Sequence, residues 1–287
     1  MNHPAHRKTT NVQVSLKLGS RTDVGRKRHE NEDSLLAASP VFIVADGMGG
    51  LEAGSRASAA VIAEFESSVS RTGLSVDDAV AAVERARAMV RTVSESTARG
   101  AGTTLAGLVL VEHENSPQWL VLNVGDSRVY RLQGGELHQL TVDHSLVQQL
   151  LDDGSLLQTD VATFARKNVI TRALGADNST ADYWLRPVET GERLLVCSDG
   201  LSGELSDESI KAGLLLGGTS QETADRLLSS ALEHGGRDNI SVIVIDVIAG
   251  GASSWPDGVN DDDHSDTIDN RTDDTRPVQR VARNAAR

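Results

Sequence analysis

The strongest constraint on the fold is a series of short apolar segments, rich in β-branched residues, that follow one another closely along the chain. Such runs are typical of buried β-strands. Six stand out: VFIVA (41–45), TTLAGLVLV (103–111), WLVLNVGD (119–126), SRVYRL (127–132), ERLLVCSD (192–199) and ISVIVIDVI (240–248). Because strands adjacent in sequence favour antiparallel pairing, we expect antiparallel sheets, with 119–126 and 127–132 close enough for a hairpin-like pair.

Three segments have the apolar spacing of amphipathic helices: residues 53–69, 75–96 and 219–236. The second opens with Ser75 and Asp78, which have the spacing of a capping box. The third opens with Thr219 and Glu222 in the same spacing and stops at Gly235. These signals predict where two of the helices begin.

Composition divides the chain into three parts. Of its 287 residues, 39% are hydrophobic and 24% charged, which is ordinary for a globular protein. We expect residues 1–11 to form a flexible arm and residues 12–249 a single domain. Residues 250–287 are rich in Asp, Ser, Asn and Thr, begin acidic and end basic, and predict a polar, disordered tail. A docking or regulatory role of that tail stays open.

The charge and the cysteine content limit the partners. A net charge of −13 argues against sequence-independent nucleic-acid binding and against docking on anionic lipid. The single cysteine, Cys197, excludes an internal disulfide and suits a reducing compartment. We find no apolar signal region and no apolar run of about 18 residues. We therefore expect a cytoplasmic protein with no nucleic-acid or membrane partner.

Carboxylates recur where the apolar segments end or begin. Asp46, Asp126 and Asp199 follow such segments, Asp238 precedes one, and Glu32 and Asp33 stand side by side before another. Any one of them could be an ordinary turn residue, since Asp-Gly is a common turn dipeptide. Carboxylates gathered at strand ends repel one another and are costly to bury without a cation. Their repetition therefore indicates a cation site.

The donor types narrow the choice of ion and of reaction. We find no His/Cys cluster with zinc spacing, and oxygen ligands favour Mg²⁺ or Mn²⁺. Asp46 could bridge two ions roughly 3.5–4 Å apart, and Gly47 would let a backbone carbonyl turn toward a metal. A water between two such ions is a nucleophile near neutral pH, which predicts phosphoester hydrolysis. The segment GRKRHENEDS (25–34) offers arginines to grip a phosphoryl group.

Eight stretches of the chain, in order, resemble the bacterial metal-dependent protein phosphatases, the PPM or type 2C Ser/Thr phosphatase family. They are RTDVGRKRHENEDS, FIVADGMGG, GTTLAGLVL, NVGDSRVYRL, DHSL, NVITRALG, RLLVCSDGL and GGRDNISVIVI, and they cover roughly residues 18–248. The resemblance implies an α+β fold. The implied fold would be a four-layer α-β-β-α sandwich in which two antiparallel sheets pack together, with a dinuclear metal cleft at one edge.

The resemblance also implies a metal role for five residues. Asp46 would bridge two Mn²⁺ or Mg²⁺ ions, and Gly47 would add its carbonyl oxygen. Asp199 and Asp238 would complete one of the two ions. Asp126 would help to hold a third, weaker ion.

Three further residues would act on water and substrate. Glu32 and Asp33 would hold metal-bound waters, and Arg28 would bind the phosphate. Animal members carry a His, a proposed general acid, where this chain has Met48. The group that protonates the leaving oxygen therefore stays open, with a metal-bound water and His144 as candidates, although His144 has the features of a structural residue.

The implied activity is hydrolysis of phosphoserine and phosphothreonine in proteins, reversing a bacterial Ser/Thr kinase, by a chain we expect to be monomeric. One alternative is a phosphatase-fold module that binds phosphoproteins without turnover, but such a chain should have lost a metal carboxylate. Another is a regulator devoted to one phosphoserine on a sigma-factor antagonist, which the sequence does not separate from the first reading. A cysteine phosphatase is excluded, because Gly203 stands where Cys197 would need an Arg.

Overall fold

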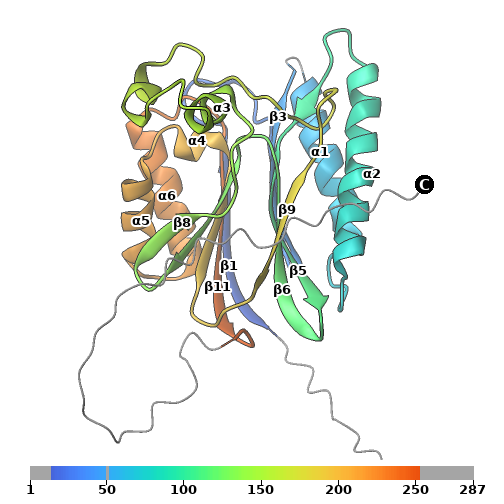
Figure 1. Ribbon diagram of the computed structural model, residues 1–287, viewed down its shortest axis with the longest axis vertical. Coiled ribbons are helices and arrows are strands. Elements are labelled where there is room, and N and C mark those ends of the chain that lie inside the picture. The colour runs from blue at the N-terminus through green and yellow to red at the C-terminus, as the bar shows by residue number, and fades with distance from the viewer. Residues whose placement is uncertain (1–13, 50–51, 253–287) are drawn as a thin grey trace, which may run out of the picture.

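The computed structural model describes residues 14–49 and 52–252, and these form four layers. Two β-sheets pack face to face, and helices cover the outer face of each (Figure 1). The predicted α+β sandwich with two antiparallel sheets is therefore confirmed. The flexible arm (1–11) and nearly all of the polar tail lie outside the described residues, and the domain boundaries stay predictions.

The first sheet has five strands, all antiparallel to their neighbours. In spatial order they are β1 (Ser15–Asp23), β11 (Ile240–Ala249), β10 (Arg193–Cys197), β7 (Arg128–Gln133) and β8 (Glu136–Gln139). Its outer face is covered by α4 (Asp199–Ser202), α5 (Asp207–Leu215) and α6 (Ser220–His234). Leu227 and Ala231 of α6 pack there against Leu195 and Val244 of the sheet.

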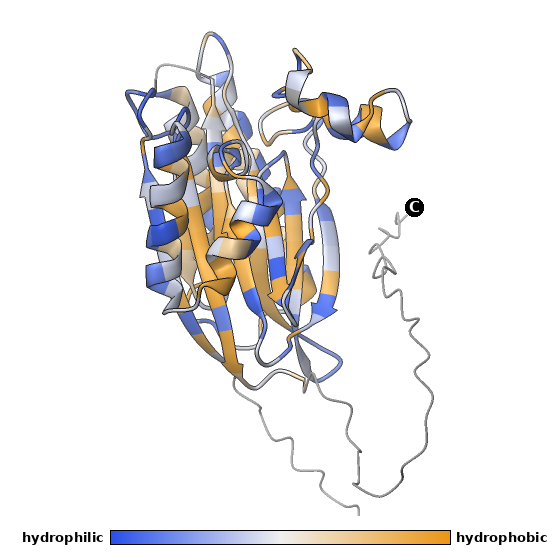
Figure 2. Ribbon diagram, turned by 90° about the vertical axis from the view of Figure 1, so that its left-hand side faces the viewer, coloured by the Kyte–Doolittle hydropathy of each residue, from blue (hydrophilic) through white to orange (hydrophobic). Residues whose placement is uncertain are grey.

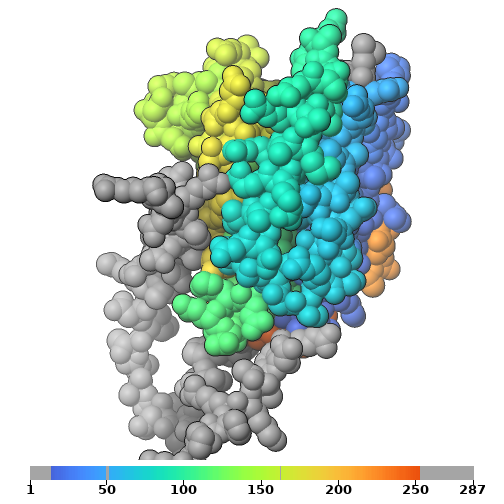
Figure 3. Space-filling model, turned by 90° about the vertical axis from the view of Figure 1, so that its right-hand side faces the viewer, coloured from blue at the N-terminus to red at the C-terminus, as the bar shows by residue number. Residues whose placement is uncertain are grey.

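The second sheet lies on the other side of the core. Its main path is β2 (Asp33–Ala38), β3 (Val41–Met48), β5 (Leu105–His113), β6 (Ser116–Val124) and β9 (Asp182–Pro187), and β4 (Gly102–Thr103) pairs with the end of β3. Helices α1 (Ala53–Glu66) and α2 (Val76–Glu95) lie side by side over its outer face (Figure 3). Both sheets are thus enclosed by helices on one face and by each other on the opposite face.

This enclosure explains why the strands are almost continuously apolar. Along β3, Val41 and Ile43 point to the core beneath α1 and α2, whereas Phe42 and Val44 point to the core between the sheets. A strand buried on both faces needs apolar residues at successive positions. Figure 2 shows the same distribution, with hydrophobic strands beneath helices whose exposed faces are largely hydrophilic.

Two of the predicted helix starts are confirmed in detail. Ser75 caps α2 and exchanges hydrogen bonds with Asp78, and Thr219 does the same with Glu222 at the start of α6. Helix α6 ends at Gly235, as its sequence predicts. These pairs satisfy backbone donors that a helix cannot satisfy itself.

The expected hairpin-like pairing of residues 119–126 with 127–132 is wrong. Strand β6 pairs with β5 and β9, whereas β7 pairs with β10 and β8, so the chain changes sheets between them. Gly125, with φ of +109°, lies in this crossing. Because each segment has two apolar faces to bury, each gains more from the interior of its own sheet than from a two-stranded ribbon.

A small subdomain stands beyond the edge where β6, β10 and β3 end. It contains α3 (Leu146–Asp152) and a 3₁₀ helix, η1 (Gln158–Thr163), and it projects at the top of Figure 1. Its two ends are joined by a bridge between Ser145 and Ile170 and by a hydrogen bond from Leu146 N–H to the Val169 carbonyl (2.8 Å). In the described part of the chain, no helix is both long and apolar enough to cross a membrane.

Candidate metal centre

The strand-end carboxylates meet at one edge of the sandwich. Asp33 begins β2, Asp46 lies near the end of β3, Asp126 follows β6, Asp199 follows β10, and Asp238 precedes β11. Asp33 and Asp46 are direct partners in the β2–β3 register. The charges of Asp33, Asp126 and Asp199 all raise the pKa of Asp46. The structure therefore brings together side chains that are scattered over more than 200 positions of the sequence.

Burial and mutual repulsion disturb the ionisation of these groups. Burial, followed by neighbouring carboxylate charges, raises the pKa of Asp46 and Asp126 well above the ordinary range. Burial raises the pKa of Asp33 to about 7, although hydrogen bonds from Ser198 and Ser241 act against it. Asp199 shifts in the same direction, again mainly by burial. A cation among them would favour the ionised carboxylates and so oppose these shifts.

Several buried carboxylate oxygens point at no donor in the described residues. These atoms are Glu32 Oε1, Asp33 Oδ1, Asp126 Oδ1 and Asp199 Oδ1. Unsatisfied buried acceptors are costly, and an all-oxygen donor set suits a hard divalent ion such as Mg²⁺ or Mn²⁺. As these side chains lie in the described residues, no group of three or more Asp, Glu, His or Cys is arranged so that it could hold a metal ion. The fit to a hard ion rests on the unsatisfied carboxylate oxygens.

The backbone of Asp46 is fixed by two threonines that sequence reasoning missed. Its N–H donates to Thr104 Oγ1 (2.9 Å), and its carbonyl accepts from Thr104 N–H (2.8 Å) and from Thr103 Oγ1 (2.9 Å). Next along β3, Gly47 donates its N–H to the Glu32 carbonyl (3.1 Å), and a Cβ there would collide with the backbone of Gly54. The Thr-Thr pair in GTTLAGLVL was the available signal.

A third missed residue, Asn239, ties the β1–β2 loop to the site. Its Nδ2 donates to the carbonyls of Val24 and Glu30 (2.9 Å each), and its Oδ1 accepts from Glu32 N–H (2.8 Å). All three hydrogen bonds of this one buried side chain therefore shape the loop that carries Arg28 and Glu32. The only sequence signal is the position of Asn239 directly after Asp238.

Arg28 lies at the rim of the carboxylate cluster. Its Nη2 forms an ion pair with Asp238 Oδ2 at 2.7 Å, and its side chain is 49% exposed. The hydrogen bond that Arg28 donates to Asp238 raises the pKa of Arg28, and the charges of Asp46 and Glu32 act in the same direction. The structure thus brings the predicted phosphate-binding residue and the predicted metal ligands into one site, with the guanidinium on the solvent side.

His144 has both ring nitrogens engaged. Nδ1 accepts from Gly125 N–H (3.1 Å), which leaves the proton on Nε2, 3.2 Å from Asp182 Oδ2. The ring is 5% exposed, and Arg172 also contacts Nε2. This network holds the turn that precedes Asp126 and favours the structural interpretation of His144.

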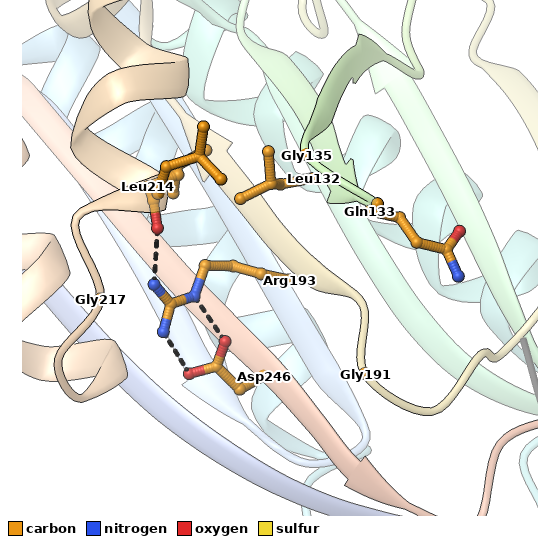
Figure 4. Close-up of a pocket in the computed structure, with 10 residues that line it drawn as sticks. Leu132, Gln133, Gly135, Gly191, Arg193, Leu214, Gly217 and Asp246 are labelled. Atoms are coloured by element: carbon orange, nitrogen blue, oxygen red, sulfur yellow. Dashed lines mark hydrogen bonds and ion pairs between the residues drawn. The ribbon is translucent and has the colours of Figure 1, made fainter.

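A separate pocket of about 320 Å³ lies away from the carboxylates, near the start of β10 and the end of β11. Figure 4 shows Arg193 there, held by the carboxylate of Asp246 and the carbonyl of Leu214. Its other N–H groups donate to Thr223 Oγ1 and the Gly218 carbonyl. All five guanidinium donors are used, so this arginine fastens α5 and the loop after it to the sheet.

Without metal, we expect the chain to lose stability as pH rises from about 4 to about 7. Asp33 has an ordinary pKa of 3.8 and a folded pKa of about 7, so the native state binds more protons than the unfolded chain in this window. Stability then falls as pH increases. In EDTA, Tm should be lower at about pH 8 than at about pH 5, and added Mn²⁺ should restore most of the difference.

Asp33→Asn is the variant to compare, because it removes one of the titrating carboxylates and should make the fall of Tm with pH smaller. A Tm in EDTA that is equal or higher at about pH 8 would contradict this prediction.

Comparison with known proteins identifies the family. The sequence profile of the family described as "Protein phosphatase 2C" matches residues 26–234. The serine/threonine phosphatase Stp of Listeria monocytogenes is 35% identical over 240 residues, covering 79% of this chain and 94% of that protein. The serine/threonine protein phosphatase PstP of Mycobacterium tuberculosis is 34% identical over 241 residues, covering 83% of this chain but only 46% of PstP.

Solved structures agree with the sequence matches. A crystal structure of the Mycobacterium tuberculosis phosphatase PstP/Ppp superposes with a TM-score of 0.76 at 34% identity, covering 83% of this chain and 100% of that one. The catalytic domain of PstP in complex with two manganese ions gives a TM-score of 0.75 at the same identity and coverage. The four layers, the carboxylate edge and these matches together show that the chain belongs to the protein phosphatase 2C family.

Proposed function

We propose that this chain is a metal-dependent protein phosphatase that hydrolyses phosphoserine and phosphothreonine in proteins. The observation that carries the proposal is the group of buried carboxylate oxygens without hydrogen-bond donors, at an edge where an arginine meets solvent. The activity named for Stp and PstP and the two manganese ions of the PstP catalytic domain support it.

The proposed metal ligands are the residues that the resemblance indicates. Asp46 would be shared by two Mn²⁺ or Mg²⁺ ions, with Asp199 and Asp238 completing one and the Gly47 carbonyl adding to the other. Asp126 would serve a third, weaker ion. Bound ions would supply a nucleophilic water near neutral pH and positive charge for the phosphoryl oxygens.

The chain's own residues would do the rest. Arg28 would donate hydrogen bonds to the phosphoryl oxygens and hold the phosphorus in line for attack. Glu32 and Asp33 would accept hydrogen bonds from water in the site. The P–O bond to the Ser or Thr oxygen breaks as the oxygen of water adds to phosphorus. The thioether of Met48 has no ionisable proton, and both ring nitrogens of His144 are already hydrogen-bonded. We therefore propose that water protonates the leaving oxygen.

We further propose that the substrates include targets of a bacterial Ser/Thr kinase and that the chain acts as a monomer. A cytoplasmic location is the accompanying proposal, supported by Cys197, which is free and buried. Residues 12–249 would be the catalytic domain.

The direct test is hydrolysis of a phosphothreonine peptide by the purified chain with Mn²⁺, with Mg²⁺ and with EDTA. We expect turnover with either ion and none above background in EDTA. Asp238→Asn should need more Mn²⁺ for half-maximal rate, by at least the roughly 10-fold to 100-fold that is lost when a residue supporting a metal ligand is replaced. Peptide binding with no turnover under any condition would favour the alternative, a phosphoprotein-binding module.

A further inference from the structure

A groove of about 280 Å³ begins at Met48, two residues beyond Asp46 of the candidate metal centre. One wall is formed by Met48 and Gly49, which follow Asp46 and Gly47 along the chain. The opposite walls are the stretch from Ser94 at the end of α2 to Gly102, and the turn at residues 173–176. Figure 3 shows these last two segments as neighbours at the upper edge of the molecule.

The walls of the groove are backbone and small side chains held by hydrogen bonds. Thr103 and Leu174 exchange N–H···O bonds of 3.0 and 2.9 Å, and Ala101 N–H donates to Ser94 Oγ (3.1 Å). A Cβ at Gly102 would come within 3.0 Å of the Leu174 carbonyl, so a larger residue would close the gap. The groove is therefore formed before any ligand arrives, as binding sites usually are.

Arg99 supplies the charge of the groove. It lines the cavity, is exposed, and makes no hydrogen bond or ion pair with the described residues. Its neighbours differ: Arg56 donates to Ser96, Arg87 pairs with Glu84, and Arg91 pairs with Glu95. On a chain of net charge −13, an arginine facing a cavity without a carboxylate is available to a negatively charged ligand.

We propose that this groove binds the segment of the phosphoprotein next to the phosphorylated residue, and that Arg99 pairs with an acidic side chain of that segment. The inference rests on the proposed function. Met48 is two residues from Asp46 along β3, a distance of about 7 Å at the rise of a strand. An extended peptide has the same rise, so its side chains two or three positions from the phosphoresidue reach the groove. Arg99 is thus a specificity residue outside the metal centre.

The test compares phosphothreonine peptides that carry Asp, Ala or Lys two and three positions from the phosphothreonine, on either side. The wild-type chain should prefer Asp over Ala over Lys on one side, mainly through KM. Arg99→Gln should reduce this preference by about 3-fold to 5-fold, the range of a solvent-exposed ion pair. Arg99→Glu should reverse it.

Two controls separate the groove from general damage. Arg91→Gln removes an exposed arginine of α2, eight residues before Arg99, that is already paired with Glu95, and it should leave the preference unchanged. p-Nitrophenyl phosphate has no peptide to place in the groove, so its kcat/KM should be the same in all variants.

A second variant fills the cavity without touching the charge. Ala176 is exposed and lines the groove, so Ala176→Leu should narrow it without unfolding the chain. We expect a lower kcat/KM on every peptide and an unchanged kcat/KM on p-nitrophenyl phosphate. The proposal is overturned if Arg99→Gln keeps the wild-type preference, or if it lowers hydrolysis of p-nitrophenyl phosphate equally.

Failure of the proposed function would be recognised separately, because the wild-type chain would then hydrolyse none of these substrates. In that case, fluorescence anisotropy of the same peptides would test whether the groove binds them. Weaker binding of the Asp peptide by Arg99→Gln than by Arg91→Gln would support it, and equal binding would reject it.

Discussion

Replacing Asp46 by Asn should lower kcat/KM on a phosphothreonine peptide by on the order of 10³-fold or more, while the chain stays folded. Asp46 is the carboxylate on which the charges of Asp33, Asp126 and Asp199 converge. Asn has nearly the same shape but no negative charge, so it cannot be shared by two cations. Three decades in rate correspond to about 4 kcal/mol of transition-state stabilisation.

The stability of the same variant should not fall together with its activity. Asp46 is buried among the like charges of Asp33, Asp126 and Asp199, and Asn removes one of these repelling charges. In EDTA the variant should therefore melt at the wild-type temperature or above. The increase in Tm that Mn²⁺ gives the wild-type chain should be largely lost, which ties the loss of activity to the ions rather than to misfolding.

A matched control is Asp77→Asn, the same chemical change at an exposed position in the first turn of α2. It should keep both activity and the Mn²⁺-induced rise in Tm. Asp46→Asn retaining activity within tenfold of wild type, or responding to Mn²⁺ as the wild type does, would contradict the proposed bridging role.

Patterns within short stretches of the sequence predicted many of the strands and two of the helix starts. Strands buried on both faces are continuous apolar runs, so β3, β10 and β11 were visible in the sequence, as were the two capping boxes. Strand β1 was not: as an edge strand of its sheet it has only Gly19 fully buried, and its sequence, SLKLGSRTD, is largely polar. A half-exposed strand gives a weaker signal than a buried one.

The remaining features depend on contacts between distant parts of the chain. Asn239 bonds Glu32 across 207 positions, and Arg28 meets Asp238 across 210. No pattern within a short window predicts such a contact, although the residue types hinted that they belonged to one site. The predicted hairpin between the segments of β6 and β7 is wrong for the same reason. Whether two adjacent strands form a hairpin or join two different sheets depends on partner strands elsewhere in the chain.

The second large effect should come from Glu192, at the end of the sandwich opposite the carboxylates. Its side chain is fully buried, and Oε1 accepts from Trp119 Nε1–H (2.8 Å) and Glu189 N–H (3.0 Å). Oε2 accepts from Arg131 Nε–H (2.9 Å). Trp119 lies on β6 and Arg131 on β7, so this one carboxylate joins the two sheets.

Glu192→Ala should destabilise the chain by about 3–5 kcal/mol, the usual cost of breaking a buried ion pair from one side. The change leaves the indole and backbone donors unbonded around a cavity. Among the described residues it leaves the guanidinium of Arg131 with Glu189 alone as an ionic partner, and it also removes the pairing of Glu192 with Arg186. Glu192→Gln keeps the shape and an acceptor for Trp119, so it should cost less. Urea unfolding followed by circular dichroism, in EDTA, measures the difference.

Glu114→Ala is the control, because that side chain is 85% exposed and should change stability by less than about 0.5 kcal/mol. The initial rate per folded molecule should stay at the wild-type level in Glu192→Ala at low temperature, since the cluster lies at the other end of β6 and β10 from Asp126 and Asp199. A loss of stability no larger than that of the control would mean that hydrophobic packing alone joins the sheets. The expected pair of results would separate the two ends of the sandwich, with the carboxylates at one end sacrificing stability for cation binding and Glu192 at the other end contributing stability alone.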